Sequence, residues 1–292
     1  MIRLTSIAPN ERPAAALASV EAGLEDLGAV RAAAEGCRAC DLWAQATQTV
    51  FGEGPVPARL MLIGEQPGDR EDLEGHPFVG PAGRILDDAL EAAGIDRETV
   101  FVTNVVKHFK WRPAPGSKRR LHERPTKAEV GACLPWVQTE LALVQPEAVV
   151  LLGATATDAL VGPKIRVTRD HGRPLDTRIA PFVVATIHPS AVLRARGADA
   201  RTAAMAGLVA DLRTVADHLG NTAQTGRHTS HGGNDRSGAD PLLDVGFARR
   251  HVLAQKPTAA RRGPTRVAAH AIGADAGTRT TRHHSRLVKV AR

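Results

Sequence analysis

Four short apolar segments constrain the fold of this chain more than any other feature of its sequence. They are residues 59–64 (RLMLIG), 100–106 (VFVTNVV), 148–153 (AVVLLG) and 182–188 (FVVATIH). Each is rich in Val, Ile or Leu and lacks an alternation of apolar with polar residues, which is typical of parallel strands buried on both faces. We therefore predict four strands of one parallel sheet.

Helical patterns lie between and after these segments, at residues 81–94, 126–145, 154–162 and 200–220. The first opens with Pro81 and closes on Gly94, residue types that favour the start and the end of a helix. The second begins at Thr126 with Glu129 three residues later, which is the pattern of a capping box. Strands that alternate with helices indicate a three-layer α/β/α domain with a central four-stranded parallel sheet.

The charge of the chain is divided unevenly. Residues 1–220 contain 25 Lys and Arg against 27 Asp and Glu, whereas residues 221–292 contain 13 against 4, a net charge of +9. The last segment is polar and lacks the periodic apolar pattern of a core. We therefore expect an N-terminal extension at 1–23, a domain at 24–220 and a disordered basic tail at 221–292.

Basic residues also concentrate within the domain. The window 107–127 contains eight Lys and Arg and one Glu, which suggests a local anionic partner rather than a generally basic surface. No run of 18 apolar residues is present, so we expect no membrane-spanning segment. The first residues lack the apolar core of a signal peptide, and we expect a cytoplasmic protein with reduced thiols.

The few cysteines of the chain suggest a metal site. Cys37 and Cys40 form a C-x-x-C pair, and Cys133 follows much later. Such a pair suits zinc, a redox dithiol or an iron–sulfur cluster. Because the chain has three cysteines, a site with four ligands needs one other ligand, and His108 is the best candidate. Composition alone leaves zinc and iron–sulfur open.

Several residues follow the predicted strands, at the sheet edge where such folds bind ligands. Gly64 and Gly68 in GEQPGD allow a tight turn after the first strand, although such glycines often mark a turn and nothing more. Phe78 lies in a loop bounded by Pro and Gly, where it could stack on a flat ring or fill the core. His188 could polarise a carbonyl while Arg194 contacts phosphate, but a lone histidine at a strand end is more often structural.

The segment 117–125 (SKRRLHERP) is the unusual part of the basic window. Lys118, Arg119 and Arg120 come directly before a leucine and His122. Prolines and a glycine on both sides of these residues indicate a loop. Taken alone, the segment is best interpreted as a phosphate-binding loop in which the histidine is only a polar tip.

The arrangement of these motifs along the chain points to a family. CRACDL, VFGEGPVPARLMLIGEQPGDREDLEGHPFVGPAGRIL, TNVVKHFKW, PTKAEVGACLPWVQTEL, VVLLGATA and TIHPSAVLR occur in this order. Together they resemble the iron–sulfur uracil-DNA glycosylases of family 4. The resemblance covers roughly residues 24–216, does not extend to 221–292, and implies the uracil-DNA glycosylase fold.

Two departures from family 4 point to one subgroup. Family 4 proper has Cys at the position of His108, and it lacks the insertion that carries KRRLH. The UdgX family has both the histidine and a KRRIH-like loop, which this chain resembles with Leu121 in place of Ile. The resemblance therefore identifies the chain as similar to UdgX-type proteins, which bind or excise uracil in DNA.

The resemblance implies a role for each residue of the uracil pocket. Phe78 would stack on uracil, Asn104 would read the edge of the base, and His188 would donate toward a uracil oxygen. Glu65 would lie near the sugar and stabilise charge, and Gln66 would complete the pocket. Uracil must leave the base stack to reach these residues, so the expected partner is single-stranded DNA or a flipped-out nucleotide.

The same resemblance implies that His122 bonds to C1′ of the sugar after uracil leaves, which gives a stable protein–DNA adduct. The flanking DNA would be held by further residues, namely Lys118, Arg119, Arg120, Ser190 and Arg194. A [4Fe-4S] cluster would be bound by Cys37, Cys40, His108 and Cys133. We further expect a monomer that acts once, in the cytoplasm near the nucleoid.

Three other functions remain open at the level of sequence. The first is an ordinary uracil-DNA glycosylase that turns over. The second is a protein that binds uracil-containing DNA without catalysis. The third is a zinc-binding structural or regulatory α/β protein. Formation of a covalent adduct and the identity of the metal distinguish among them.

Overall fold

The structure is a computed structural model, and it describes residues 26–229 of the chain. The expected N-terminal extension at 1–23 and the tail from residue 230 onward lie outside the described residues. Within the described part, none of the helices combines the length and the apolar character needed to cross a membrane.

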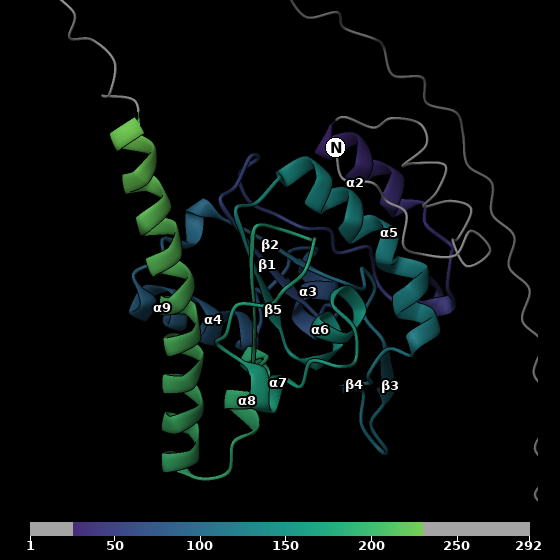
Figure 1. The fold of residues 1–292 in the computed structure, drawn as a ribbon. Coiled ribbons are helices and arrows are strands. Elements are labelled where there is room, and N and C mark those ends of the chain that lie inside the picture. The colour runs from purple at the N-terminus through teal and green to yellow at the C-terminus, as the bar shows by residue number, and fades with distance from the viewer. Residues whose placement is uncertain (1–25, 230–292) are drawn as a thin grey trace, which may run out of the picture. The chain divides into compact units, whose positions relative to one another are not determined.

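A parallel four-stranded sheet forms the centre of the described part of the chain (Figure 1). Its strands follow the order β2-β1-β5-β6. The register of the first pair runs from Leu60 opposite Val100 to Gly64 opposite Asn104. The predicted fold class is confirmed, and the strands are β1 (Leu60–Gly64), β2 (Val100–Asn104), β5 (Ala148–Leu152) and β6 (Phe182–Thr186).

The sheet is buried on both faces because its strands are apolar at nearly all positions. In β1, Met61 and Ile63 join the core cluster on one face, while Leu60 and Leu62 join the cluster on the other. This division follows from the alternation of side chains along a strand. Each fully buried aliphatic side chain contributes about 1.5–3 kcal/mol to folding, so the sheet is a firm base for the loops at its edge.

Helices cover the two faces of the sheet, as Figure 1 shows. One face carries α2 (Leu27–Glu35), α5 (Lys127–Val144), α6 (Ala154–Leu160) and the short α7 (Val167–Asp170). The other face carries α4 (Pro81–Ala93), α8 (Pro189–Arg194) and α9 (Ala198–Thr229). The smaller elements are the helix α3 (Asp69–Glu74) and the 3-10 turns Asp41–Ala44 and Arg97–Thr99.

The predicted helix ends are confirmed where the sequence carried a specific signal. Thr126 caps α5 by accepting from the backbone of Glu129, whose carboxylate accepts in return from the Thr126 amide at 2.6 Å. Gly94 ends α4 at a φ of 76°, a conformation that favours glycine. Helix α9 continues to Thr229, beyond the domain boundary expected at 220, because adding residues to a formed helix needs no new nucleus.

A two-stranded antiparallel hairpin carries the basic segment, which the sequence analysis treats as a loop. Its strands are β3 (Trp111–Pro113) and β4 (Arg120–His122), with Trp111 opposite His122. Gly116 takes a φ of 67° in the turn between them. The hairpin is inserted between β2 and α5, so it leaves the sheet edge at which β2 ends.

Candidate active site

The carboxyl ends of the parallel strands bring together residues that are far apart in the sequence. Glu65 directly follows β1, Asn104 is the last residue of β2, and His188 lies two residues beyond β6. Thr155 lies in the first turn of α6, just after β5. Because the ends of parallel strands share one edge of the sheet, these side chains face a common region.

Glu65 is the centre of this region. One carboxylate oxygen, Oε1, lies 3.3 Å from Nε2 of His122 on the hairpin. The other, Oε2, accepts a hydrogen bond from the hydroxyl of Thr155, and the Arg124 guanidinium lies 3.8 Å from it. The structure therefore joins two predicted catalytic residues, Glu65 and His122, that are separated by a long stretch of chain.

The carboxyl of Glu65 is held in its ionised form. Burial by itself would raise its pKa, but hydrogen bonds from His122 and Thr155, with smaller electrostatic contributions from the imidazoles of His122 and His188, hold the pKa below the ordinary value. A carboxylate is the form that can stabilise positive charge on a neighbouring sugar or imidazole. The arrangement suits a reaction in which positive charge develops beside Glu65.

Arg120 anchors the hairpin rather than pointing toward solvent. Its guanidinium lies 2.5 Å from Asp69 and 2.6 Å from the fully buried Asp72. It also lies over the rings of Phe109 and Trp111. The expected contact of Arg120 with phosphate is therefore not what this geometry shows, because its donors are committed to carboxylates. Both Lys118 and Arg119, in contrast, are exposed.

Gln66 clamps the two strands of the hairpin together at their base. Its Nε2 donates to the carbonyls of Lys110 and Glu123, at 3.2 and 3.0 Å, and its Oε1 accepts from the Lys110 amide. Lys110 and Glu123 come directly before Trp111 and directly after His122. The side chain is buried and its amide is fully used, so Gln66 supports the hairpin instead of lining the pocket.

Aromatic residues surround the imidazole of His122. Its ring lies 6.2 Å from the ring of buried Phe109. Trp111 is its cross-strand neighbour, and the indole of Trp111 donates to the carbonyl of Gln45 at 3.0 Å. Directly opposite residues of an antiparallel pair present their side chains on the same face. His122 is half exposed, so the ring has fixed neighbours and remains open to a large partner.

Asn104 holds a polar atom that lacks a partner. The residue is 3% exposed, and its Oδ1 is the buried side-chain N or O atom without a hydrogen bond in the described part of the chain. Unpaired buried polar atoms are costly, so their presence in a native fold needs an explanation. A ligand that donates a hydrogen bond at this point is the simplest one.

Phe78 lies beside this unpaired oxygen. A Cβ on Gly64 would come within 2.4 Å of Asn104 Oδ1 and 2.7 Å of the Phe78 ring, so only glycine lets both side chains pack this closely against the end of β1. Phe78 itself has a φ of 59°, which is strained for a bulky residue. Its ring is stacked toward His188 at a centroid distance of 6.2 Å.

Ser190 and Arg194 fix the tautomer of His188. The Ser190 amide donates to His188 Nδ1 at 3.2 Å, and the Ser190 hydroxyl lies 2.7 Å from the same nitrogen. Arg194 donates to that hydroxyl at 2.9 Å, so the hydroxyl hydrogen is free to point at Nδ1. Because Nδ1 accepts, the ring proton lies on Nε2, which can donate to a ligand.

His188 is neutral near physiological pH. Burial lowers its pKa to about 4; the Glu65 carboxylate opposes this shift, and the Arg194 guanidinium and the imidazole of His122 add to it. A neutral imidazole that donates from Nε2 can polarise an oxygen without adding a full charge to the pocket. Ser190, a predicted substrate-binding residue, and Arg194, expected at phosphate, are joined to His188 by hydrogen bonds in this structure, and their contacts with DNA stay predictions.

The three cysteines form a partial thiol site. Lys107 donates its amide to Cys133 Sγ at 3.2 Å, and the Trp136 indole donates to Cys37 Sγ at 3.4 Å. The pKa of the Cys133 thiol is raised to about 12, chiefly by burial; Lys107 opposes this shift, and the neighbouring Cys40 and Cys37 add to it. Such a thiol needs the positive charge of a metal to become a thiolate at neutral pH.

The fourth predicted ligand, His108, contacts Thr49 through one of its two ring nitrogens. Its Nε2 lies 3.0 Å from the hydroxyl of Thr49. Burial lowers the pKa of His108 to about 4, so the imidazole is in the neutral form that binds metals. In the part of the chain that the structure describes, no three His, Cys, Asp or Glu side chains are arranged to hold a metal ion. The donor chemistry fits a thiolate-bound metal, whereas the four predicted ligands are not assembled.

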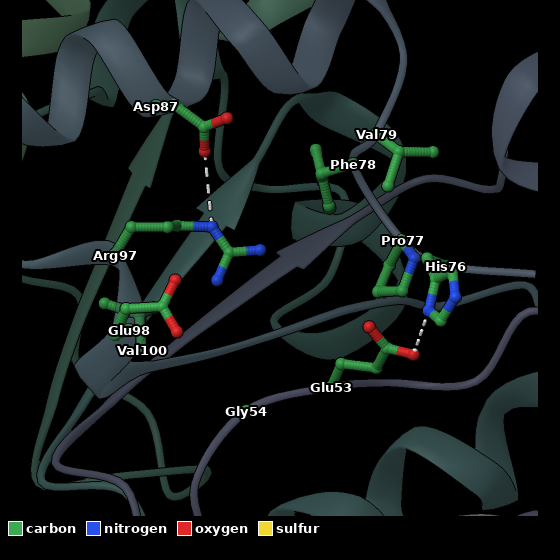
Figure 2. Close-up of a pocket in the computed structure, with 10 residues that line it drawn as sticks. All are labelled: Glu53, Gly54, His76, Pro77, Phe78, Val79, Asp87, Arg97, Glu98 and Val100. Atoms are coloured by element: carbon green, nitrogen blue, oxygen red, sulfur yellow. Dashed lines mark hydrogen bonds and ion pairs between the residues drawn. The ribbon is translucent and has the colours of Figure 1, made fainter.

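A polar pocket of about 490 Å³ lies beside the start of β2 (Figure 2). His76 Nδ1 lies 2.7 Å from Glu53 and Arg97 Nε lies 3.3 Å from Asp87. Figure 2 marks both ion pairs with dashed lines. Of the predicted site residues, Phe78 alone contributes to its lining. Glu65, Asn104 and His188 do not line this pocket, so we do not assign it as the active site.

The family that this fold and this strand-end site define is confirmed by comparison with known proteins. The family model of the uracil DNA glycosylase superfamily matches residues 51–213. The chain therefore belongs to the uracil DNA glycosylase superfamily.

Curated type-4 uracil-DNA glycosylases are similar to this chain. That of Thermotoga maritima is 39% identical over 166 residues, which span 56% of this chain and 82% of that protein. That of Pyrobaculum aerophilum is 36% identical over 176 residues, spanning 58% and 85%. That of Archaeoglobus fulgidus is 35% identical over 164 residues, spanning 54% and 78%.

Thr155, Arg124 and Trp111 contact the predicted catalytic pair but were missed by the sequence analysis. Thr155 had a usable signal, because it follows the third predicted strand at the ligand-binding edge of the sheet. Arg124 and Trp111 had none, because their contacts depend on how the hairpin docks.

Proposed function

We propose that this protein excises uracil from DNA and that His122 then captures the sugar covalently. The observation that carries the first part is the unpaired Oδ1 of buried Asn104 beside Phe78, in a member of the uracil DNA glycosylase superfamily. The contact between Glu65 and His122 at 3.3 Å supports the second part. The UdgX-type subgroup and the covalent adduct belong to this proposal.

Asn104 and Phe78 would select the base. Uracil carries an N3–H donor between two carbonyl oxygens, and the unpaired Oδ1 of Asn104 would accept from that donor while its amide donates to a neighbouring oxygen. Phe78 would stack on the flat ring. Gly64 lets these two side chains lie close together at the end of β1. Flipping the base out costs a few kcal/mol, which these contacts would offset.

Cleavage would break the bond between uracil N1 and C1′ of the sugar. The bonding electron pair leaves with uracil, and the sugar becomes an oxocarbenium ion. His188 Nε2–H would donate to a uracil oxygen as negative charge develops there, and the Glu65 carboxylate would stabilise the positive sugar. Both groups are already oriented before substrate binds, which is the condition for electrostatic catalysis.

Capture would follow on the same sugar. A lone pair on the imidazole of His122 forms a bond to C1′, and the imidazolium that results passes its extra proton to Glu65 or to solvent. An imidazole nitrogen held next to the cation competes with water because it is already positioned. The protein would therefore act once instead of turning over.

We propose further that Cys37, Cys40 and Cys133, with His108, bind a [4Fe-4S] cluster of structural role. The donor set of soft thiolates and a neutral imidazole supports it, and with His108 Nε2 at Thr49 the ligand atom of His108 would be Nδ1. The cluster would tie the N-terminal segment to α5. Iron and sulfide analysis of anaerobically purified protein should find iron, and zinc instead of iron would defeat this proposal.

DNA would be held by the exposed cations of the hairpin turn, Lys118 and Arg119. The tail at 221–292, with its net charge of +9, would add salt-sensitive, nonspecific affinity and no chemistry. A variant truncated after residue 229 should keep full activity at low salt and saturating DNA. Loss of activity there would make the tail part of the catalytic unit.

The proposal is tested with a uracil-containing oligonucleotide. Full-length protein should shift the labelled strand on a denaturing gel, and the mass of the adduct should equal protein plus DNA less one uracil. Free abasic sites without an adduct would indicate an ordinary glycosylase that turns over. Binding without uracil release would indicate a non-catalytic protein.

A further inference from the structure

We propose that Thr155 is a positioning residue that keeps one oxygen of the Glu65 carboxylate on His122 during capture. This inference rests on the proposed function and adds a residue to it. Thr155 lies in the first turn of α6, directly across from Glu65, and its hydroxyl donates to Glu65 Oε2. In the described part of the chain, its hydroxyl takes part in hydrogen bonds with Glu65 and Arg124.

The hydrogen bonds around Thr155 allow only one assignment of donors and acceptors. Arg124 Nε donates to Thr155 Oγ1 at 3.1 Å, so the hydroxyl acts as an acceptor there. Its single hydrogen then points to Glu65 Oε2. With Oε2 occupied, Oε1 remains directed at His122 Nε2, 3.3 Å away. Arg124, Thr155, Glu65 and His122 thus form one chain of contacts that ends at the proposed nucleophile.

Glu65 needs such a tether because several groups compete for it. Arg124 lies 3.8 Å from Oε2, and the imidazoles of His122 and His188 also face the carboxylate. Without the hydroxyl, the nearest competing cation for Oε2 is Arg124, whose side chain is more than half exposed. A carboxylate that turns toward Arg124 would take Oε1 away from His122.

Thr157 offers a matched control in the same helix. It is fully buried, and its hydroxyl donates to the Gly153 carbonyl at 2.9 Å without approaching Glu65. If threonine hydroxyls in α6 only stabilise the helix, loss of either one should have the same effect. If Thr155 orients Glu65, only its loss should alter the chemistry.

The expected consequence is a change in the fate of the sugar. In Thr155→Val, the rate of adduct formation should fall about tenfold to a hundredfold, the range carried by one hydrogen bond to a charged group. Uracil release should fall less, so a larger share of events should end as free abasic sites. Removal of the Thr155 hydrogen bond also raises the pKa of Glu65, so the decline of capture on acidification should begin at a higher pH.

The experiment follows release and adduct formation by the full chain in single-turnover reactions from pH 4 to 8. We expect the same dependence of adduct formation on pH in the wild type, in Thr157→Val and in the rescue variant Thr155→Ser. Thr155→Val should differ from all three. If the methyl group that replaces the hydroxyl in Thr155→Val does not fit, Thr155→Ala should show the same change in adduct formation. A wild type that forms no adduct would refute the proposed function itself.

Two outcomes would overturn the role of Thr155 alone. One is a folded Thr155→Val protein with the wild-type rate, branching and pH profile, beside a wild type that forms the adduct. The other is failure of both Thr155→Val and Thr155→Ala to fold while Thr157→Val folds, which would make Thr155 a structural residue.

Discussion

The base pocket and the hairpin hold their catalytic groups in opposite ways. Asn104 and Phe78 are buried and stand on the sheet and its helices, whose cores fix them. His122 is half exposed on a short two-stranded ribbon, which is fixed by polar contacts from Arg120 and Gln66. Recognition of the base is thus part of the folded core, whereas the nucleophile is carried by an inserted segment.

This difference implies that the two parts of the reaction can be separated by mutation. Changes in the base pocket should remove release and capture together, because capture needs the cation that release creates. Changes in the hairpin should remove capture and spare release. The predictions below test that division in order of decreasing effect.

The largest effect is expected for Asn104→Ala. The substitution removes the proposed acceptor for uracil N3–H, so the pocket no longer recognises that edge of the base. Single-turnover release should fall by about a hundredfold or more, and adduct formation should fall with it. Quantifying both products from one reaction checks this. A variant that releases slowly but captures every sugar it frees would still fit, whereas unchanged release would place recognition elsewhere.

Arg120→Met should mainly affect capture. It breaks the ion pairs to Asp69 and the fully buried Asp72 and leaves that buried carboxylate short of a partner. Breaking such a pair destabilises a fold by up to about 3–5 kcal/mol, and here the loss should fall on the hairpin. Adduct formation should drop at least tenfold while release changes little. Arg112→Met, on the neighbouring strand β3 and exposed, is the matched control.

Gln66→Met should loosen the same hairpin by a smaller amount. Its loss leaves two carbonyls and one amide of the hairpin base without their partner, at a cost of about 1–3 kcal/mol. Hydrogen exchange of the β3 and β4 amides should become faster, and exchange in the sheet should not change. Equal acceleration in both would show that the hairpin is not an independent unit.

The pKa of His188 gives a test on the pocket side. It is lowered to about 4 in the folded state, against an ordinary value of 6.5. The unfolded chain therefore binds a proton before the folded one does, so stability falls as pH drops from about 6.5 toward 4. Between pH 7 and pH 5 this residue should account for about 2 kcal/mol of lost stability. In urea unfolding, the loss of stability between pH 7 and pH 5 should be about 2 kcal/mol smaller for His188→Gln than for the wild type.

The sequence predicted the sheet well because its signal is local. Strands such as Leu60–Gly64 are apolar at every position, and Thr126 and Gly94 mark helix ends through their immediate neighbours. The strand-end residues Glu65 and Asn104 followed from the topology of parallel sheets. Their roles were expected from the family resemblance and remain proposals.

The hairpin contacts were not predictable in the same way. Arg120 looked like a phosphate ligand because a run of cations carries no information about carboxylates far away in the sequence. Its pairing with Asp69 and Asp72 depends on docking of the hairpin against α3. Gln66 was expected in the uracil pocket because it follows Glu65 in the sequence. That position does not reveal that its side-chain amide bonds to the backbone at the base of the hairpin.

The most direct test of the account is His122→Ser with uracil-containing DNA. Its side chain is half exposed, so the substitution should leave the fold intact and open space for water at the sugar. We expect no adduct on a denaturing gel, uracil release close to the wild-type rate, and free abasic sites that alkali cleaves over several turnovers. A His122→Ser protein that still forms the full adduct would contradict His122 as the nucleophile. One that releases no uracil would contradict the separation of release from capture.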